Sequence, residues 1–382
     1  MNSLLTLSSV DAVDSCLAQI ERLNPHLNAF ITVLADEARE QARQADAEIN
    51  VGKRRGPIHG VPIGIKDFYD TAGVRTTAAF EKFANRVPAR DAEAVAALKA
   101  AGAIIIGKTN MHQLGTGTTG LESYFGAVRN PINDAYIPGG SSSGSAAAVA
   151  TGMCAATLDT DAIGSCRLPA ACCGVVGFKP TFGAISTKGI LEGEKTDDTI
   201  LWLSHAGITT RSVEDTIVMF EVLAGRQTST SAAREVRIGV ANNFTADSEV
   251  ARAFDAAVSI VRGLGHPVSN ASAPFQMPKF GDLRTIADDR KTIADRGFKD
   301  MDVLLLPTTA TAVLSVEQAK GKPQALSAAN TMFANYYGLP AISVPCGFDS
   351  RGLPIGLQIV GRPGEDAMVL HLAREYESST AS

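Results

Sequence analysis

Two turns rich in serine and glycine, joined by a run of small residues, constrain this chain more than any other feature. The first turn, residues 139–143, reads GGSSS and leads into the apolar run AAAVA. The second turn, residues 161–166, reads DAIGSC and contains Ser165. Far upstream, Lys66 follows the strand-like run VPIGI. A lysine and two serine turns in this arrangement suggest a base, a relay and a nucleophile that need no histidine.

The length and composition of the chain favour one large globular domain. The chain has 382 residues, of which 45% are hydrophobic and only 20% are charged. This balance is that of a globular protein with a big interior and not of a disordered chain. No internal repeat, low-complexity tract or linker divides the sequence, so we expect a single domain over residues 1–382.

Charge and cysteine usage argue against several other classes of protein. The net charge of −5 gives no electrostatic reason to expect nucleic acid, and the basic run at 53–55 is short enough to be solvated surface. No apolar run reaches the roughly 18 residues that span a membrane. The six cysteines and six histidines show no metal-ligand spacing, so no metal or other cofactor is expected. Without a secretory leader, we expect reduced thiols and a cytoplasmic protein.

Hydrophobic periodicity predicts an alternation of helices and strands. Helices are expected at residues 8–23, 34–49, 91–101, 212–225, 250–264 and 367–376. Strands are expected at residues 61–65, 103–106, 236–240, 303–306, 341–344 and 355–360. This alternation predicts an α/β sheet with covered faces.

Each candidate residue also has a simpler structural interpretation. Lys66 could pair with Asp67 at the end of its strand, and Ser165 could be a serine in a tight turn before a helix. The run GGSSSGS could be a flexible loop, but the small-residue helix that follows it argues against a linker. A lysine acts as a base only when it is neutral, and burial of Lys66 would lower its pKa toward neutrality. Taken jointly, the lysine and the two turns favour a catalytic site.

The lysine and the two serine turns closely resemble those of the amidase-signature family of serine hydrolases, and the resemblance runs over nearly the whole chain. The resemblance implies an α/β fold with a mixed central sheet covered by helices on both faces. It also implies cleavage of C–N amide bonds by a Lys–Ser–Ser triad. By this resemblance Lys66 is the base, Ser141 is a relay with a cis peptide bond, and Ser165 is the nucleophile that forms an acyl-enzyme.

The resemblance also assigns roles around the triad. Amide hydrolysis needs preorganised donors for the developing oxyanion. The backbone amides of Ala162, Ile163 and Gly164, together with that of Ser165, match the oxyanion hole of the family. Other positions match supporting or substrate-lining sites, and these are Ser142, Gly115, Thr116, Thr119, Asp161 and Arg167. No carboxylate is positioned to orient His112, which is expected to be structural.

Two departures from the family pattern bear on the substrate. The family usually has glycine where this chain has Ile163, which would be strained at a positive φ and would restrict the space beside Ser165. The stretch at about 245–300 is shorter than in most members, which removes part of the wall of the substrate cavity. Apolar residues left uncovered there would favour a homodimer or a small partner protein.

Three functions remain open on this basis. The first is a stand-alone amidase that hydrolyses a small-molecule amide to a carboxylate and ammonia or an amine. The second is the glutamine-hydrolysing subunit of an amidotransferase, which passes ammonia to aminoacyl-tRNA on a partner. The third is a non-catalytic binding protein that keeps the fold. We favour the first, because the shortened stretch removes surface that a partnered subunit would need.

Overall fold

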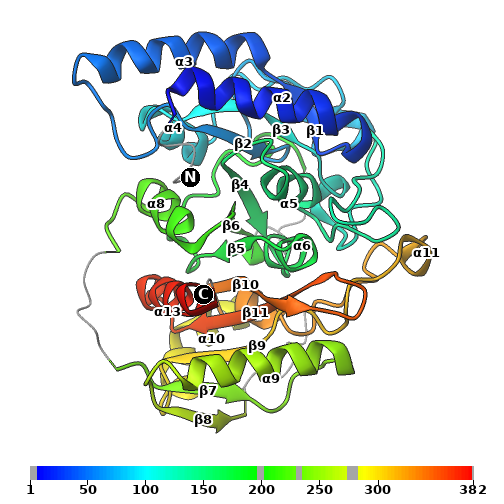
Figure 1. The fold of residues 1–382 in the computed structure, drawn as a ribbon, viewed down its shortest axis with the longest axis vertical. Helices are drawn as coiled ribbons and strands as arrows, with labels where there is room; N and C mark the ends of the chain where they lie inside the picture. Colours follow the sequence, from blue (N-terminus) through cyan, green and yellow to red (C-terminus); the bar gives the residue numbers. More distant parts are fainter. Residues whose placement is uncertain (1–6, 196–201, 229–234, 273–282, 381–382) are drawn as a thin grey trace.

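The computed structural model describes residues 7–195, 202–228, 235–272 and 283–380. Their strands are β1 (Phe30–Val33), β2 (Pro62–Lys66), β3 (Ile104–Thr109), β4 (Ala156–Asp161), β5 (Val176–Lys179), β6 (His205–Thr210), β7 (Ile238–Ala241), β8 (Val268–Ala271), β9 (Val303–Pro307), β10 (Ala341–Phe348) and β11 (Pro354–Gly361). All of them belong to one 11-stranded sheet with the order β1-β3-β2-β4-β6-β5-β10-β11-β9-β7-β8. Figure 1 shows this sheet running along the long axis of the molecule.

The sheet is mixed, as the family resemblance implies. β2 runs parallel to β3 and β4, and β7 runs parallel to β8 and β9. The other neighbouring pairs are antiparallel. Parallel strands need crossover connections, which helices supply, whereas β10 and β11 are joined by a short hairpin turn. Lys66 ends β2, and Ser165 follows β4, so both lie at the parallel part of the sheet. Ser141 lies in the loop before α5.

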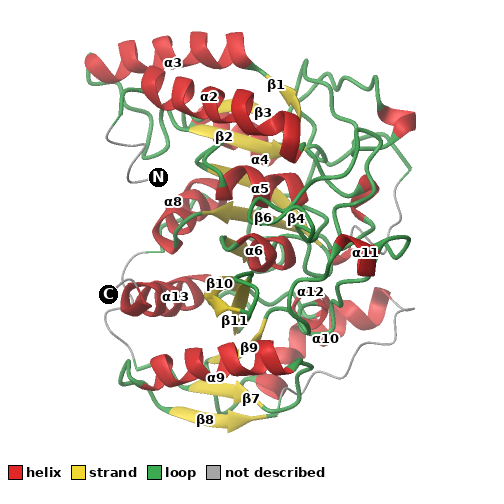
Figure 2. Ribbon diagram, turned by 45° about the vertical axis from the view of Figure 1, so that its right-hand side comes forward, coloured by secondary structure: helices red, strands yellow, loops and turns green. Residues whose placement is uncertain are grey.

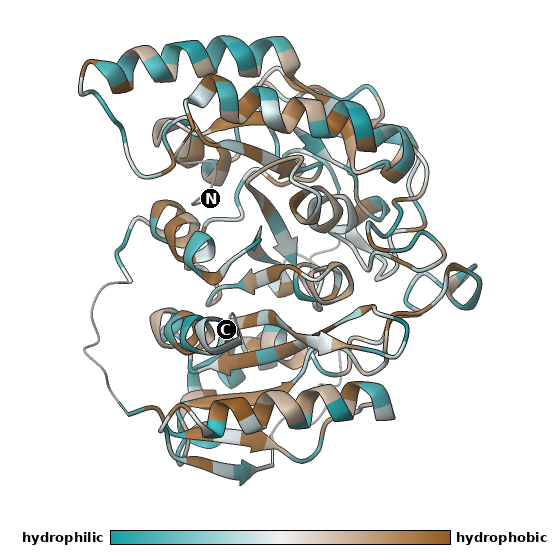
Figure 3. Cartoon of the chain, viewed as in Figure 1, coloured by the Kyte–Doolittle hydropathy of each residue, from teal (hydrophilic) through white to brown (hydrophobic). Residues whose placement is uncertain are grey.

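The helices are α2 (Ser9–Leu27), α3 (Ala35–Asn50), α4 (Glu93–Ala100), α5 (Ser143–Ala150), α6 (Arg167–Cys173), α8 (Val213–Ala224), α9 (Ser248–Arg262), α10 (Leu283–Gly297), α11 (Val316–Ala319), α12 (Met332–Tyr336) and α13 (Asp366–Thr380). They lie on both faces of the sheet (Figure 2). Figure 3 shows helices that are brown on one side and teal on the other, with mostly brown strands between them. This pattern is expected where helices bury one apolar face against a sheet.

Core packing shows why both faces are covered. Side chains alternate between the two faces of a strand, so neighbours in β3 enter different cores. Ile105 belongs to a large core that also contains Phe220 of α8. Ile104 and Ile106 belong to a second core with Val13 of α2. Central strands with apolar residues on both faces are fixed in the sheet by both cores.

Some element boundaries differ from those predicted. α2 continues past the predicted end at residue 23 to Leu27, with Pro25 in its last turn. β3 continues past residue 106 to Thr109, and Gly107 allows the close approach of β1, since a Cβ at Gly107 would lie 2.3 Å from the Thr32 carbonyl oxygen. The sequence did not predict β1, β4, β5, β6 or β8. Polar residues hide the period of a strand in β4, β6 and β8, and β1 and β5 are only four residues long. Among the described residues, no helix has both the length and the apolar character needed to cross a membrane.

Candidate active site

Lys66 is the last residue of β2 and is completely buried. Its Nζ donates to Ser141 Oγ at 2.8 Å, to Ser142 Oγ at 2.9 Å and to Thr160 Oγ1 at 2.9 Å. The strand thus carries the amine to the point where the first serine turn meets the end of β4. Sequence reasoning assigned Ser142 a supporting role and missed Thr160, which lies in an unpredicted strand.

The surroundings of Lys66 favour its neutral form. Burial lowers the pKa of Lys66 to about 8, although Asp159 raises it by attraction. Three hydroxyl oxygens surround the amine, and each of them can accept or donate a hydrogen bond. The amine can therefore exchange a proton with Ser141 without losing its other partners. This is the geometry that a lysine base requires.

Ser141 follows a cis peptide bond between Gly140 and Ser141. Gly139 has a φ of +77°, and a Cβ there would lie 2.7 Å from Cα of Pro169, so glycine is required at this position. The main-chain N–H of His112 donates to the Ser141 carbonyl oxygen at 3.0 Å. Backbone contacts on both sides therefore fix the hydroxyl of Ser141 beside the amine.

Ser165 lies in the turn between β4 and α6, and the residue is 3% exposed. The N–H of Ser142 donates to the Ser165 carbonyl oxygen at 3.0 Å, which joins the two serine turns. Gly164 has a φ of +131°, and a Cβ there would lie 2.4 Å from Thr331 Oγ1. Glycine before the serine is therefore required both by backbone conformation and by space.

The turn before Ser165 carries the amides expected to bind an oxyanion. The Gly164 N–H donates to Asp161 Oδ1 at 2.7 Å, so it is already engaged. The N–H groups of Ala162, Ile163 and Ser165 form no hydrogen bond within the described part of the chain. Ile163 does not have a positive φ, so the strain considered for it does not arise. Three free amides beside the serine could bind an oxyanion.

A buried polar network braces this turn. Arg167 donates to both carboxylate oxygens of Asp161, at 2.9 and 3.0 Å, and to Gln358 Oε1 at 2.6 Å. Asn335 Nδ2 donates to Asp161 Oδ1 at 2.9 Å, and Thr331 Oγ1 donates to the Ile163 carbonyl oxygen. Burial opposes the charge of Asp161, but the guanidinium beside it holds the pKa of this carboxyl well below its usual range. The sequence indicated the Asp161–Arg167 pair, but not its partners on α12 and β11.

Of the predicted supporting or substrate-lining positions Gly115, Thr116 and Thr119, only some lie near Ser141. Gly115 does, since a Cβ there would lie 3.7 Å from Ser141 Oγ. Thr119 is buried, and its Oγ1 lies 3.4 Å from His112 Nδ1. Thr116 is exposed and donates to the Gln113 carbonyl oxygen. The three positions therefore differ in their access to the triad.

His112 has features of a structural residue. It is completely buried, and burial with the nearby Lys66 lowers its pKa to about 4, so the ring is neutral at pH 7. A Cβ at Gly117 would lie 2.1 Å from the ring, so the imidazole packs directly on that backbone. Contrary to the sequence-based expectation, a carboxylate does lie near the ring, since His112 Nε2 is 3.7 Å from an oxygen of Glu122, although this distance is too long for a hydrogen bond. The ring shapes the segment that follows it in the sequence.

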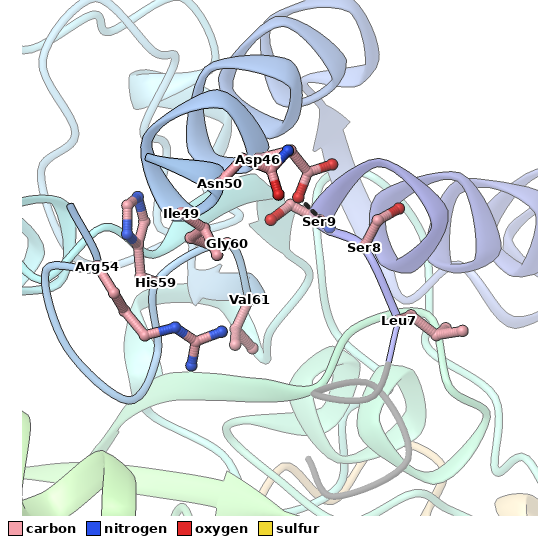
Figure 4. Close-up of a pocket in the computed structure, with 10 residues that line it drawn as sticks. All are labelled: Leu7, Ser8, Ser9, Asp46, Ile49, Asn50, Arg54, His59, Gly60 and Val61. Atoms are coloured by element: carbon pink, nitrogen blue, oxygen red, sulfur yellow. Dashed lines mark hydrogen bonds between the residues drawn. The ribbon is translucent and has the colours of Figure 1, made fainter. Parts of the chain in front are cut away.

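A separate hollow of about 200 Å³ lies between α2, α3 and the start of β2, and no triad residue lines it. Figure 4 shows Ser9 and Asp46 at one side and Arg54 and His59 at the other. The N–H of Ser9 donates to Asp46 Oδ1 at 2.7 Å, which caps the start of α2. No group of three potential metal ligands occurs among residues that the structure describes.

Comparison with known proteins identifies the family of this chain. The sequence profile of the Amidase family matches residues 11–280 and 283–370. A glutamyl-tRNA(Gln) amidotransferase subunit of Geobacter metallireducens is 32% identical, with 98% of this chain and 94% of the relative covered. That alignment is longer than this chain, which therefore lacks residues that the relative has. Within the stretch expected to be shortened, residues 273–282 lie outside the described residues.

Two solved structures extend the comparison. A crystal structure of an amidase superposes with a TM-score of 0.86 at 29% identity, over 98% of this chain and 96% of that one. A 6-aminohexanoate cyclic dimer hydrolase in complex with substrate superposes with a TM-score of 0.82 at 27% identity, over 98% and 94% of the two chains. With a family profile matched over nearly its whole length and these neighbours in structure, the chain belongs to the amidase-signature family.

Proposed function

We propose that this chain hydrolyses a C–N amide bond through an acyl-enzyme on Ser165. The observation that carries the proposal is the contact of the buried Lys66 amine with Ser141 Oγ at 2.8 Å. A serine hydroxyl is a weak nucleophile unless a base removes its proton. A lysine held partly neutral by burial can act as that base at mildly alkaline pH. Family membership supports the same chemistry.

In the proposed reaction, Ser165 Oγ attacks the amide carbonyl carbon while its proton passes to Ser141, whose own proton passes to neutral Lys66. The oxyanion accepts hydrogen bonds from the free amides of the turn at 162–165. When the C–N bond breaks, the proton returns through Ser141 to the leaving nitrogen. Water then attacks the ester by the same proton path, which releases the carboxylate and restores Ser165.

We propose glutamine as the first substrate to test, with this chain serving in an amidotransferase that includes a partner. The support is the similarity to the glutamyl-tRNA(Gln) amidotransferase relatives, which cover nearly all of this chain. This reverses the preference drawn from the shortened stretch. A stand-alone hydrolase of small amides is the second candidate, supported by the likeness to an amidase and to a cyclic dimer hydrolase.

Ammonia release from the purified chain separates these candidates. Glutamine and a panel of small primary and secondary amides would be supplied without any partner, with Ser165→Ala as the control. Turnover of small amides, but not of glutamine, would contradict the amidotransferase proposal. Glutamine hydrolysis, or no turnover until a partner protein is added, would support it. Failure of Ser165 to react with a fluorophosphonate would favour a non-catalytic binding protein.

We also propose self-association or binding of a small partner protein. Phe182 and Trp202 are each 40% exposed. Both lie beside α10, which belongs to the stretch expected to be shortened. Large exposed aromatic side chains favour an interface. Light scattering at micromolar concentration tests this, and a monomer would contradict self-association. All six cysteines are free, which supports a cytoplasmic location.

A further inference from the structure

Arg290, on α10, has no role in the proposed reaction, and its guanidinium binds main-chain carbonyls. Its Nε donates to the Tyr336 carbonyl oxygen at 2.8 Å. Its Nη2 donates to the carbonyl oxygens of Trp202 at 2.8 Å and Asn335 at 3.0 Å. Among the described residues, no carboxylate forms an ion pair with Arg290. A partly buried guanidinium without a counter-charge is costly, so its contacts need an explanation.

These carbonyls belong largely to the C-terminal end of α12, which lies beside α10 (Figure 2). The last carbonyls of a helix have no partner within the helix, and a cation there is favourable. The guanidinium also stacks on Phe182, with its carbon 3.8 Å from the ring centroid. Gly338 leaves room for this stack, since a Cβ there would lie 3.0 Å from Phe182 Cβ and 3.4 Å from Arg290 Cδ. Arg290 thus fixes the end of α12 from outside.

The same end of α12 also contacts the turn at residues 161–166, which contains Ser165, on the buried side of the helix. The Asn335 side chain donates to the Asp161 carbonyl oxygen at 2.7 Å and to its Oδ1 at 2.9 Å. Asp161 Oδ1 in turn accepts the N–H of Gly164 at 2.7 Å. Asn335 and Asp161 are completely buried, so water cannot replace either bond. A continuous path of contacts therefore leads from Arg290 to the residue that precedes Ser165.

We propose that Arg290 is a positioning residue for the Ser165 turn and acts through Asn335. This inference rests on the proposed function and deepens it. Without the guanidinium, the end of α12 loses its anchor and the Asn335 amide no longer holds Asp161 in one position. A small displacement of the turn misdirects both the nucleophile and the free amides, which lowers the rate of reaction. Arg290 contacts no member of the triad, so the titration of Lys66 stays unchanged.

The test is the rate at which a fluorophosphonate labels Ser165 in four proteins: wild type, Arg290→Met, Arg290→Lys and Lys291→Met. Lys291 is the matched control, because it is the next residue on α10 and pairs with Asp288 at the surface. Folded Arg290→Met is expected to label about tenfold to a hundredfold more slowly than wild type. Arg290→Lys should show a smaller loss of labelling rate, because it keeps a positive charge beside the carbonyls. The pH midpoint of labelling should not move, and the control should match wild type within about twofold.

A double-variant cycle tests the path through Asn335. Arg290→Met should add little to the loss already caused by Asn335→Ala, because both break one path. The proposal is overturned if the fold-loss of labelling rate in the double variant equals the product of the fold-losses in the two single variants. It is also overturned if folded Arg290→Met labels within about twofold of the wild-type rate. If Arg290→Met does not fold, wild-type labelling by Arg290→Lys overturns it instead. Failure of the wild type itself to label would overturn the proposed function, and this inference with it.

Discussion

Two completely buried lysines lie near the ends of neighbouring parallel strands, Lys66 as the last residue of β2 and Lys108 as the last but one of β3, and only one has the surroundings of a catalytic base. Lys66 on β2 and Lys108 on β3 lie one register step apart, since Lys66 pairs with Thr109. Burial lowers the pKa of each to about 8. Neither burial nor position in the sheet therefore distinguishes them.

The partners of the two amines distinguish them. Lys66 Nζ contacts three hydroxyls, including Ser141. Lys108 Nζ donates to the Tyr69 carbonyl oxygen at 2.6 Å and to Thr76 Oγ1 at 2.8 Å, and lies 3.7 Å from Asp67 Oδ1. A carbonyl and a carboxylate accept hydrogen bonds without returning a proton, and they favour the charged amine. The partners of its amine therefore make a buried lysine a base or a structural cation.

The largest expected effect is the loss of the nucleophile. Ser165→Ala should remove several orders of magnitude of amide turnover, because no acyl-enzyme can form. The fold should survive, since the turn tolerates a methyl side chain. Initial rates and a melting curve on the same sample measure both properties. More than about a tenth of the wild-type rate in a purified sample would refute the assignment.

Replacing each lysine in turn tests the comparison itself. Lys66→Ala should lower turnover by about a thousandfold or more, because the proton of Ser165 then has no base. Lys108→Met should leave the rate per folded molecule within about threefold of wild type. A melting curve on each sample would give the folded fraction to which the rates are normalised. Equal losses of turnover in the two variants would contradict the assignment of Lys66 as the base and Lys108 as a structural cation.

Asp159 provides a test of the charge around Lys66. Its carboxyl is completely buried, and its Oδ2 accepts from Thr157 and Thr209 at 2.7 Å each. The attraction of Asp159 raises the pKa of Lys66, so Asp159→Asn should lower it. The rate, which rises with pH as Lys66 loses its proton, should then reach half its maximum at a lower pH. An unchanged or higher midpoint in the pH–rate profile would contradict this.

The smallest effect on activity, with a clear effect on stability, is expected at Lys108. Its removal leaves Asp67 as a buried carboxyl without the Lys108 cation, and within the described part of the chain Asp67 Oδ1 already has no hydrogen-bond partner. Lys108→Met should therefore lower the free energy of unfolding by about 3 kcal/mol. The double variant with Asp67→Asn should recover part of that loss, as urea denaturation would measure. If Lys108→Met were as stable as wild type, the Lys108–Asp67 pair would contribute nothing to the free energy of unfolding.

The contrast between residues that the sequence revealed and those it did not has a physical reason. Lys66, Ser141 and Ser165 stand in local patterns, where a strand end or a glycine turn marks each one. Thr160 was missed because β4 reads ATLDTD, whose polar side chains face a buried network that a sequence pattern does not reveal. Asn335 was missed because it comes from a distant helix, and only folding places it against the catalytic turn. Local patterns predict reacting groups, whereas their supports depend on tertiary contacts.

The pH dependence of Ser165 labelling by a fluorophosphonate tests whether Lys66 is the base for Ser165. Measured from about pH 6 to about pH 10, the wild-type rate should rise through a single titration, because only neutral lysine accepts the proton. The midpoint should lie near 8, where burial places the pKa of Lys66. Lys66→Ala should label slowly with no such titration, whereas Lys108→Met should keep it. A flat profile in wild type, or the same titration in Lys66→Ala, would contradict the account.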